Sequence, residues 1–219
     1  MSKKYAVILS GCGYLDGAEI REAVLTLLAL DTHGASYEIF APNEKQFHTI
    51  NHLEGSEVKQ ERNILEEAAR IARGKISPLK DLDSREFSGL LIPGGFGVAK
   101  NLCDFAFKGS GAKANSIISG IITDFFAAKK PIGAICIAPA LVSLVLGEHS
   151  IEVTIGTDEG TAAEIEKTGA KHINCTESEF HLDIENKIAT TPAYMFDDNK
   201  LHLVQQGIYG VVESVIKWS

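Results

Sequence analysis

The sequence lacks the features that mark a membrane-spanning or nucleic-acid-binding protein. It contains no run of about eighteen apolar residues, the length at which a membrane-spanning helix becomes possible, so we expect no membrane partner. Its formal net charge is −8, which excludes a broad basic surface, and we expect no nucleic-acid partner. The first apolar stretch, residues 5–9, is too short for a signal peptide, which favours a cytoplasmic location.

Cysteine and histidine patterns typical of disulfide frameworks and metal sites are also missing. The four cysteines form no Cys-x-x-Cys pair; they are Cys12, Cys103, Cys136 and Cys175. The seven histidines form no His-Glu-x-x-His motif. We therefore expect free thiols, no disulfide and no metal site.

The glycine-rich loop after the first apolar stretch does not match a nucleotide-binding motif. The third glycine of a Gly-x-Gly-x-x-Gly fingerprint would fall on Asp16, and no phosphate-binding lysine follows. We expect no cofactor. For Cys12, in the same loop, a core or loop role is favoured over a second catalytic thiol.

What the sequence does contain is an alternation of short apolar runs and helical periodicities. With 219 residues, 45% of them hydrophobic, we expect one domain over residues 1–219. The expected strands are 5–9, 37–40, 89–92, 132–135, 153–155 and 172–174. The expected helices are 17–33, 64–73, 117–128, 139–146, 160–168 and 199–217. Residues 182–189 predict a β-hairpin. Repeated strand–helix units predict a parallel sheet with helices on both faces.

Residues 43–87 interrupt this alternation. The segment is polar and too long for a simple connection, so it predicts an elaboration near one end of the sheet. His52 in this segment either approaches the site or lies on the surface, and the surface position is favoured. Ligands bind at the carboxyl ends of the strands in such sheets, which selects loops 10–17, 93–100 and 136–139.

Cys136 lies where an expected strand passes directly into an expected helix. A nucleophile elbow has this layout and needs small residues two positions before and after the nucleophile, where Ala134 and Ala138 stand. The positive end of the following helix would favour the thiolate. The alternative is a buried, unreactive core cysteine. The specific turn context favours a nucleophile.

Two neighbouring features fit such a nucleophile. The run Gly94, Gly95 and Phe96 follows an expected strand, and its backbone N–H groups with that of Ile137 can form an oxyanion hole, although an ordinary glycine turn is the alternative. Glu19 begins the first helix, where it either acts as a general acid or base or only complements the helix dipole. The residues leave these two roles of Glu19 open.

These motifs, in this order, resemble the ElbB family of isoprenoid-biosynthesis glyoxalase-like proteins. That family belongs to the ThiJ/PfpI superfamily, which shares the class I glutamine amidotransferase-like fold. The matching stretches span nearly the whole chain: ILSGCGYLDGAEIREAVLTLLAL, FAPN, INHLEGSEV, RNILEEAARIARG, LLIPGGFGVAKNL, KPIGAICIAPAL, TIGTD and ATTPAYM.

The resemblance implies a flavodoxin-like three-layer α/β/α sandwich with a mostly parallel sheet and an added β-hairpin. It implies Cys136 as the nucleophile, with Glu19 as the acidic partner near the thiol. The oxyanion-hole amides would come from Gly95 or Phe96 and from Ile137. It also implies a homodimer and, for ElbB-like proteins, conversion of glyoxal to glycolate.

The chain departs from two other activities of the superfamily. Peptidase-like relatives have a histidine directly after the cysteine, where this chain has Ile137, and glutamine amidotransferases carry a late Pro-x-His-x-Glu element that residues 190–195 lack. We therefore expect a cofactor-independent glyoxalase that converts a small aldehyde substrate through Cys136 and Glu19. The alternative is a redox- or stress-sensing protein with a reactive cysteine and little turnover. Glycation repair shares the glyoxalase chemistry and stays open beside it.

Overall fold

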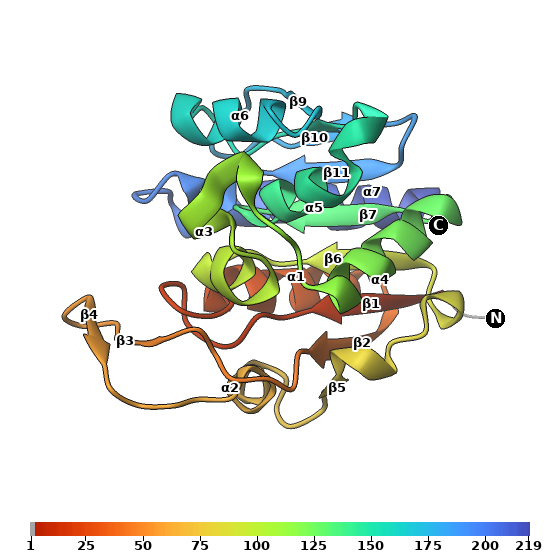
Figure 1. Ribbon diagram of the computed structural model, residues 1–219. Coiled ribbons are helices and arrows are strands. Elements are labelled where there is room, and N and C mark those ends of the chain that lie inside the picture. Colours follow the sequence, from red (N-terminus) through yellow and green to blue (C-terminus); the bar gives the residue numbers. More distant parts are fainter. Residues whose placement is uncertain (1–2) are drawn as a thin grey trace.

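The computed structural model describes residues 3–219 and is built on a seven-stranded sheet (Figure 1). The strand order is β10-β11-β7-β6-β1-β2-β5. The strands are β1 (Lys4–Ile8), β2 (Ser36–Ala41), β5 (Ser77–Pro78), β6 (Gly89–Ile92), β7 (Ile132–Ile135), β10 (His181–Asp183) and β11 (Ile188–Thr191). All neighbours pair in parallel except β10 and β11, which form the predicted antiparallel hairpin. The central order β2-β1-β6-β7-β11 is that of flavodoxin-like sheets.

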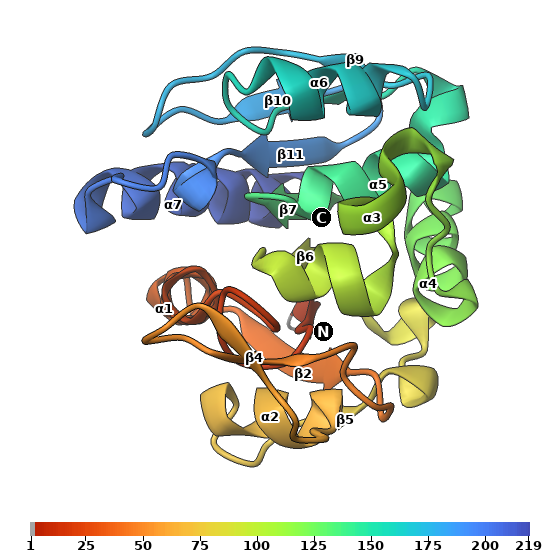
Figure 2. The ribbon, with the colours of Figure 1, turned by 60° about the vertical axis from the view of Figure 1, so that its left-hand side comes forward.

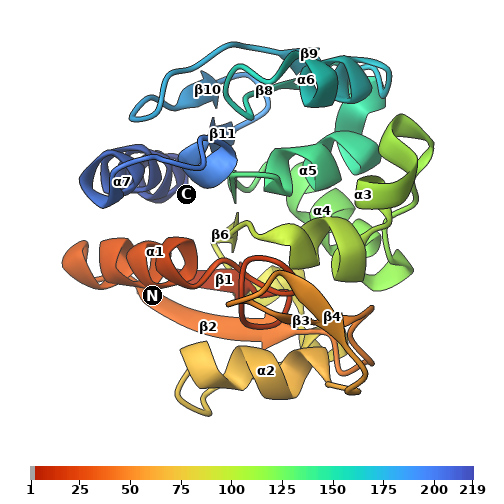
Figure 3. The same cartoon turned by 90° about the vertical axis from the view of Figure 1, so that its left-hand side faces the viewer.

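Helices cover both faces of this sheet, which confirms the predicted three-layer architecture. Figure 3 shows α1 (Ile20–Thr32) and α7 (Leu201–Trp218) side by side on one face, with α4 (Ser116–Ala127) and α5 (Ala138–Leu146) on the other. Successive side chains of β1 point to opposite faces of the sheet. Tyr5 and Val7 join the core beneath α1 and α7, whereas Ala6 and Ile8 join the core beneath α4 and α5. β6 and β7 are buried along their whole length, as expected of central parallel strands.

Two predicted strands lie outside the main sheet. β8 (Glu152–Val153) and β9 (Lys171–His172) pair with each other beside α6 (Glu159–Glu166). The sheet edge that they would extend is already paired, because β10 runs antiparallel along β11. The expected strands at 153–155 and 172–174 are thus shorter than predicted and form a separate two-stranded sheet.

The interrupted segment 43–87 is an elaboration at the carboxyl end of the sheet, as Figures 1 and 2 show. It contains α2 (Ile64–Ile71), which is predicted, and an antiparallel hairpin of β3 (Thr49–Asn51) and β4 (Ser56–Val58), which is not. β5 then joins the edge of the main sheet beside β2. The sequence prediction also omits α3 (Phe105–Lys108) and the π-helical turn Val98–Leu102. Short 3-10 turns occupy Leu79–Asp81, Ser84–Glu86, Gly109–Gly111, Gly147–His149 and Ala193–Met195. Within residues 3–219, no helix combines the length and the apolar character needed to cross a membrane.

Candidate functional site

Cys136 lies on a strained turn between β7 and α5. Its φ is +60°, a left-handed conformation that costs a non-glycine residue about 1–3 kcal/mol. The backbone N–H of Cys136 donates to the carbonyl of Thr191 at 2.9 Å, and α5 begins two residues later. Ala134 and Ala138 are both fully buried, so the turn has no room for larger neighbours. The predicted strand–turn–helix geometry is therefore present, and it points the thiol toward the carboxyl edge of the sheet.

The carboxyl group of Glu22 lies beside this thiol, a neighbour that the sequence prediction of Glu19 did not include. Glu22 is fully buried in the first turn of α1, and its Oε2 and the Cβ of Cys136 both adjoin Gly94. Its Oε2 accepts from the N–H of Gly94 at 3.0 Å, and its Oε1 accepts from the N–H of Tyr194 at 3.2 Å. These contacts fix the carboxyl group against the sulfur.

Glu19 has a different position, at the start of the same helix. Its Oε2 accepts from the backbone N–H of Glu22 at 2.6 Å, so the side chain caps the N-terminus of α1. It also lines the cavity into which Cys136 opens. Both roles that the sequence left open for Glu19 are therefore compatible with its position, because the cap leaves it facing the site.

Burial controls the protonation of both groups. Burial, with the nearby Glu19 carboxylate, raises the pKa of Glu22 to about 8, although the N–H groups that it accepts from lower it. Burial, with the neighbouring Glu22, raises the pKa of the Cys136 thiol well above its ordinary value, although the N–H groups of Gly95 and Ile137 lower it. At neutral pH both groups are mainly protonated. Desolvation therefore opposes the thiolate that the positive end of the helix was expected to favour.

The glycine run after β6 supplies fewer free N–H groups than predicted. The N–H of Gly94 is bonded to Glu22, and that of Phe96 donates to the carbonyl of Tyr14 at 2.7 Å, so neither is available for an oxyanion. The N–H groups of Gly95 and Ile137 point at the sulfur. Gly95 has a φ of +98°, and a Cβ there would lie 2.4 Å from the backbone of Gly17 and Glu19, so only glycine fits.

Cys136 opens into a cavity of about 220 Å³. Besides Cys136, Glu19, Gly95, Phe96 and Ile137, its walls are Tyr14, Thr161, Tyr194, Met195 and Asp197. Arg21 donates to the hydroxyl of Tyr194 at 3.0 Å, which fixes one wall. No histidine is among the residues of the described chain that line this cavity. Residues 3–219 also hold no group of three metal-ligating side chains.

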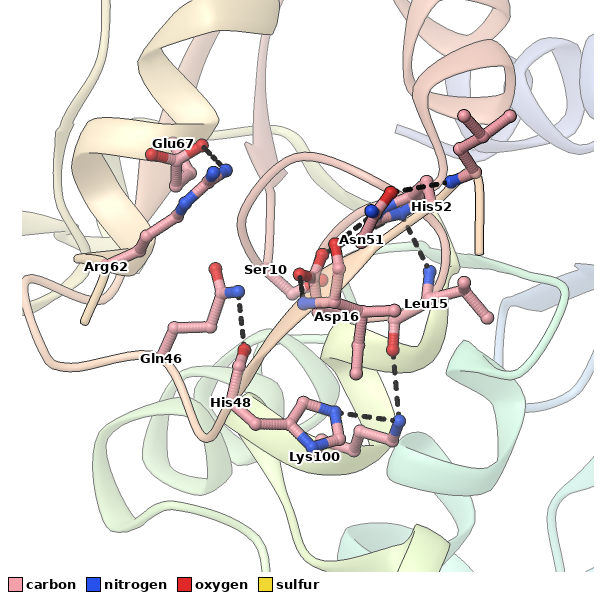
Figure 4. Close-up of polar contacts among 12 residues, drawn as sticks. Ser10, Leu15, Asp16, Gln46, His48, Asn51, His52, Arg62, Glu67 and Lys100 are labelled. Atoms are coloured by element: carbon pink, nitrogen blue, oxygen red, sulfur yellow. Dashed lines mark hydrogen bonds and ion pairs between the residues drawn. The ribbon is translucent and has the colours of Figure 1, made fainter. Parts of the chain in front are cut away.

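The elaborated segment is hydrogen-bonded to the first loop, residues 10–17 (Figure 4), of which Tyr14 lines the cavity. Oδ2 of the buried Asp16 accepts from the N–H of Ile50 at 2.7 Å, and Nε2 of His52 accepts from the N–H of Leu15 at 3.3 Å. Nζ of Lys100 donates to the carbonyl of Leu15 at 3.0 Å. His52 is exposed, as favoured from the sequence, and reaches the cavity only through its ring contact with Tyr14.

The other three cysteines lie outside this cavity. All four are free thiols; Cys103 and Cys175 are buried, and Cys12 is partly buried. Burial raises the pKa of the Cys12 thiol, and the nearby Glu67 adds to the rise. Cys136 is therefore the cysteine that combines a strained turn with a cavity and an acidic partner.

Comparisons with known proteins agree with the fold. No family model matches the chain. The ES1 protein homolog, mitochondrial, of Rattus norvegicus is 42% identical over 98% of this chain and 83% of its own length. The human glutamine amidotransferase-like class 1 domain-containing protein 3, mitochondrial, is 42% identical over 98% of this chain and 82% of its own.

Solved structures show the same arrangement. An isoprenoid biosynthesis protein with amidotransferase-like domain from Ehrlichia chaffeensis has a TM-score of 0.91 and 38% identity, and the match covers 99% of both chains. A ThiJ/PfpI domain protein from Brachyspira murdochii has a TM-score of 0.60 and 12% identity over 100% of both chains, a likeness of fold alone.

The relatives correct the expected location and show the family. The rat, human and zebrafish relatives are all mitochondrial by name, so the expectation of a cytoplasmic location is wrong. That expectation used the length of one apolar run, which forms the first strand of the sheet and carries no information on compartment. With 42% identity to relatives over nearly its whole length, the chain belongs to the ES1/ElbB family of class I glutamine amidotransferase-like proteins.

Proposed function

We propose that the protein is a cofactor-independent glyoxalase that converts small α-oxoaldehydes to 2-hydroxy acids. The observation that carries this proposal is that Cys136 and the Glu22 carboxyl group lie side by side at Gly94, next to a cavity that Cys136 and Glu19 line. One carboxyl group adjoins the nucleophile and a second faces the substrate space. The chemistry needs these two proton-transfer groups beside one thiol.

The first step is addition of the sulfur to the aldehyde carbon. The ionised fraction of Glu22 takes the thiol proton as the C–S bond forms and the π electrons of the C=O bond move to oxygen; Glu22 then gives the proton to that oxygen, which completes a hemithioacetal. The N–H groups of Gly95 and Ile137 point at the sulfur and stabilise negative charge as it develops there. A pKa of about 8 for Glu22 suits this role, because general bases work best when their pKa lies near the working pH.

The second step moves one proton between adjacent carbons. Glu19 takes the proton from the former aldehyde carbon, which gives an enediol once the neighbouring oxygen is protonated, and returns it to the neighbouring carbon as the hydroxyl proton of the first carbon is lost, which leaves a thioester of a 2-hydroxy acid. The first carbon is oxidised and the second reduced by the same two electrons, so no external oxidant or reductant enters. Burial raises the pKa of Glu19, which brings it closer to the range useful for this exchange. Hydrolysis by water then releases glycolate from glyoxal and restores the thiol.

The test is glyoxal consumption and glycolate formation by purified wild type, Cys136→Ala and Cys175→Ala. Cys175 is a matched control because it is also buried and does not line the cavity. We expect Cys136→Ala to lose at least a hundredfold in kcat/KM and Cys175→Ala to stay within about twofold, since removal of a covalent nucleophile removes the pathway itself. Full activity of Cys136→Ala would exclude the mechanism.

A further inference from the structure

A second cavity of about 510 Å³ adjoins the cavity of Cys136. Phe96, Ile137 and Thr161 line both, so the two cavities are direct neighbours that share these side chains as a wall. The outer cavity, which we call the groove, lies between the turn Val98–Leu102, α3 and the start of α6. The ring of Phe96 stands at the junction, where Nζ of Lys100 lies 4.8 Å from its centre.

The groove presents apolar surface next to the reacting centre. Phe105, Ala106, Phe107 and Ala99 line it together with Ile137. Glyoxal has only two carbons and two oxygens, so a molecule bonded to the sulfur of Cys136 cannot extend into this space. A substrate that uses the groove must carry a longer group on its second carbonyl carbon.

The two charged side chains that line the groove, Lys108 and Glu164, are each paired with a residue outside it. Nζ of Lys108 lies 2.5 Å from the carboxylate of Asp104. Glu164 accepts from the N–H and hydroxyl of Ser110 at 2.7 and 2.8 Å and pairs with Lys167 at 2.5 Å. No unpaired cation lines the groove within residues 3–219, so nothing there compensates an anionic group. The inner cavity adds two carboxyl groups, Glu19 and Asp197, which further disfavour anions.

We propose that the groove is a subsite for an apolar, uncharged substituent, so that the preferred substrates are α-oxoaldehydes with an aryl or long alkyl group. This inference rests on the proposed function for the identity of the reacting group. The direct neighbourhood of the two cavities, which share Phe96, Ile137 and Thr161 as a wall, carries the rest. Burial of the substituent against Phe105 and Ala106 supplies the selectivity over glyoxal.

The first test compares kcat/KM for phenylglyoxal, glyoxal and 4-carboxyphenylglyoxal. Ala106→Trp fills the groove from an exposed position and leaves the walls of the inner cavity unchanged. Ala163→Trp is the matched control, since Ala163 is exposed on the neighbouring helix α6 and lines neither cavity. In wild type and Ala163→Trp we expect phenylglyoxal to exceed glyoxal by at least about tenfold, the effect of even one methylene group in an apolar pocket.

Ala106→Trp should lose this preference through a lower kcat/KM for phenylglyoxal, while glyoxal turnover stays within about twofold. The carboxylated analogue should show no preference over glyoxal in any variant. Equal kcat/KM for phenylglyoxal and glyoxal in wild type overturns the subsite, and so does an equal loss on both substrates in Ala106→Trp.

A second measurement separates the subsite from the proposed function. The labelling rate of Cys136 by N-phenylmaleimide and N-methylmaleimide is followed by mass spectrometry and divided by each reagent's rate with glutathione. We expect about a tenfold preference for the phenyl reagent in wild type and Ala163→Trp, and none in Ala106→Trp. Absence of aldehyde turnover together with this labelling pattern would reject the glyoxalase and keep the subsite. Equal normalised labelling by the two reagents in wild type rejects the subsite.

Discussion

Replacing Glu22 by glutamine should change how the stability of the protein depends on pH. The pKa of Glu22 is about 8 in the folded protein and near 4.5 in an unfolded chain, because folding buries the carboxyl group. Between these values the folded state holds a proton that the unfolded state has lost. The free energy of unfolding therefore receives its full contribution from Glu22 below pH 4.5 and loses it as the pH rises toward 8.

The size of the effect follows from the separation of the two pKa values. Each pH unit within this window removes about 1.4 kcal/mol, so wild type loses roughly 3 to 4 kcal/mol from this group between pH 5 and pH 8. Glu22→Gln has no such loss. It carries a separate penalty at every pH, because both carboxyl oxygens accept backbone N–H groups and the amide nitrogen of glutamine cannot. One unsatisfied buried N–H costs about 1–3 kcal/mol.

Urea denaturation at pH 5, 6, 7 and 8 measures both terms. We expect Glu22→Gln to be less stable than wild type at pH 5, and the difference to shrink or reverse by pH 8. Glu57→Gln is the control, because Glu57 is exposed on β4 and its substitution should leave a constant difference from wild type. A difference between wild type and Glu22→Gln that stays constant from pH 5 to pH 8 would refute the assignment of a raised pKa to Glu22.

Two further predictions concern the turn and the thiol. Gly95→Ala should lower the free energy of unfolding by roughly 3 kcal/mol or more, because the residue has a positive φ and the added Cβ would meet backbone atoms. Gly111→Ala is the control: Gly111 has open space around it, so its substitution should change the free energy of unfolding by about 0.5 kcal/mol or less. Thermal denaturation compares them, and similar effects of the two substitutions would contradict the geometry. Alkylation of Cys136 by iodoacetamide, read by mass spectrometry, should rise about tenfold per pH unit from pH 7 to pH 9, because burial and Glu22 raise the pKa of this thiol. A rate that levels off below pH 8 would show that the thiol ionises more easily.

The main sheet could be predicted from the sequence because its central strands are short apolar runs ended by glycine or proline. β6 and β7 have the predicted bounds, and β1 is displaced by one residue. The hairpin of β3 and β4 could not be predicted in this way. This hairpin lies apart from both core clusters, so its strands carry no apolar alternation. The contacts of its residues Ile50 and His52 with Asp16 depend on the tertiary fold.

The position of Cys136 could likewise be predicted, whereas its partner could not. Glu19 and Glu22 lie three residues apart, and only the start of α1 decides which one turns inward. Because the helix begins at Ile20, Glu19 caps it and Glu22 falls on the buried face with Thr26, Ala29 and Leu30. A charged residue at an otherwise apolar position of that face is the signal that was available. The N–H groups of Gly94 and Phe96 donate to Glu22 and Tyr14, which are distant in sequence, so these hydrogen bonds could not be predicted from the sequence.

A protonated resting thiol bears directly on the choice between catalysis and redox sensing. Cysteines that sense peroxide are thiolates at rest and accessible to solvent. Cys136 is 7% exposed, and burial and Glu22 raise its pKa. Carbonyl addition has a different requirement, because the thiol proton needs an acceptor only while the C–S bond forms. Glu22 lies beside that thiol and has a pKa of about 8, so an acceptor for the proton is already in place. The burial that slows oxidation therefore leaves the addition of an aldehyde open, which favours the glyoxalase over the sensor.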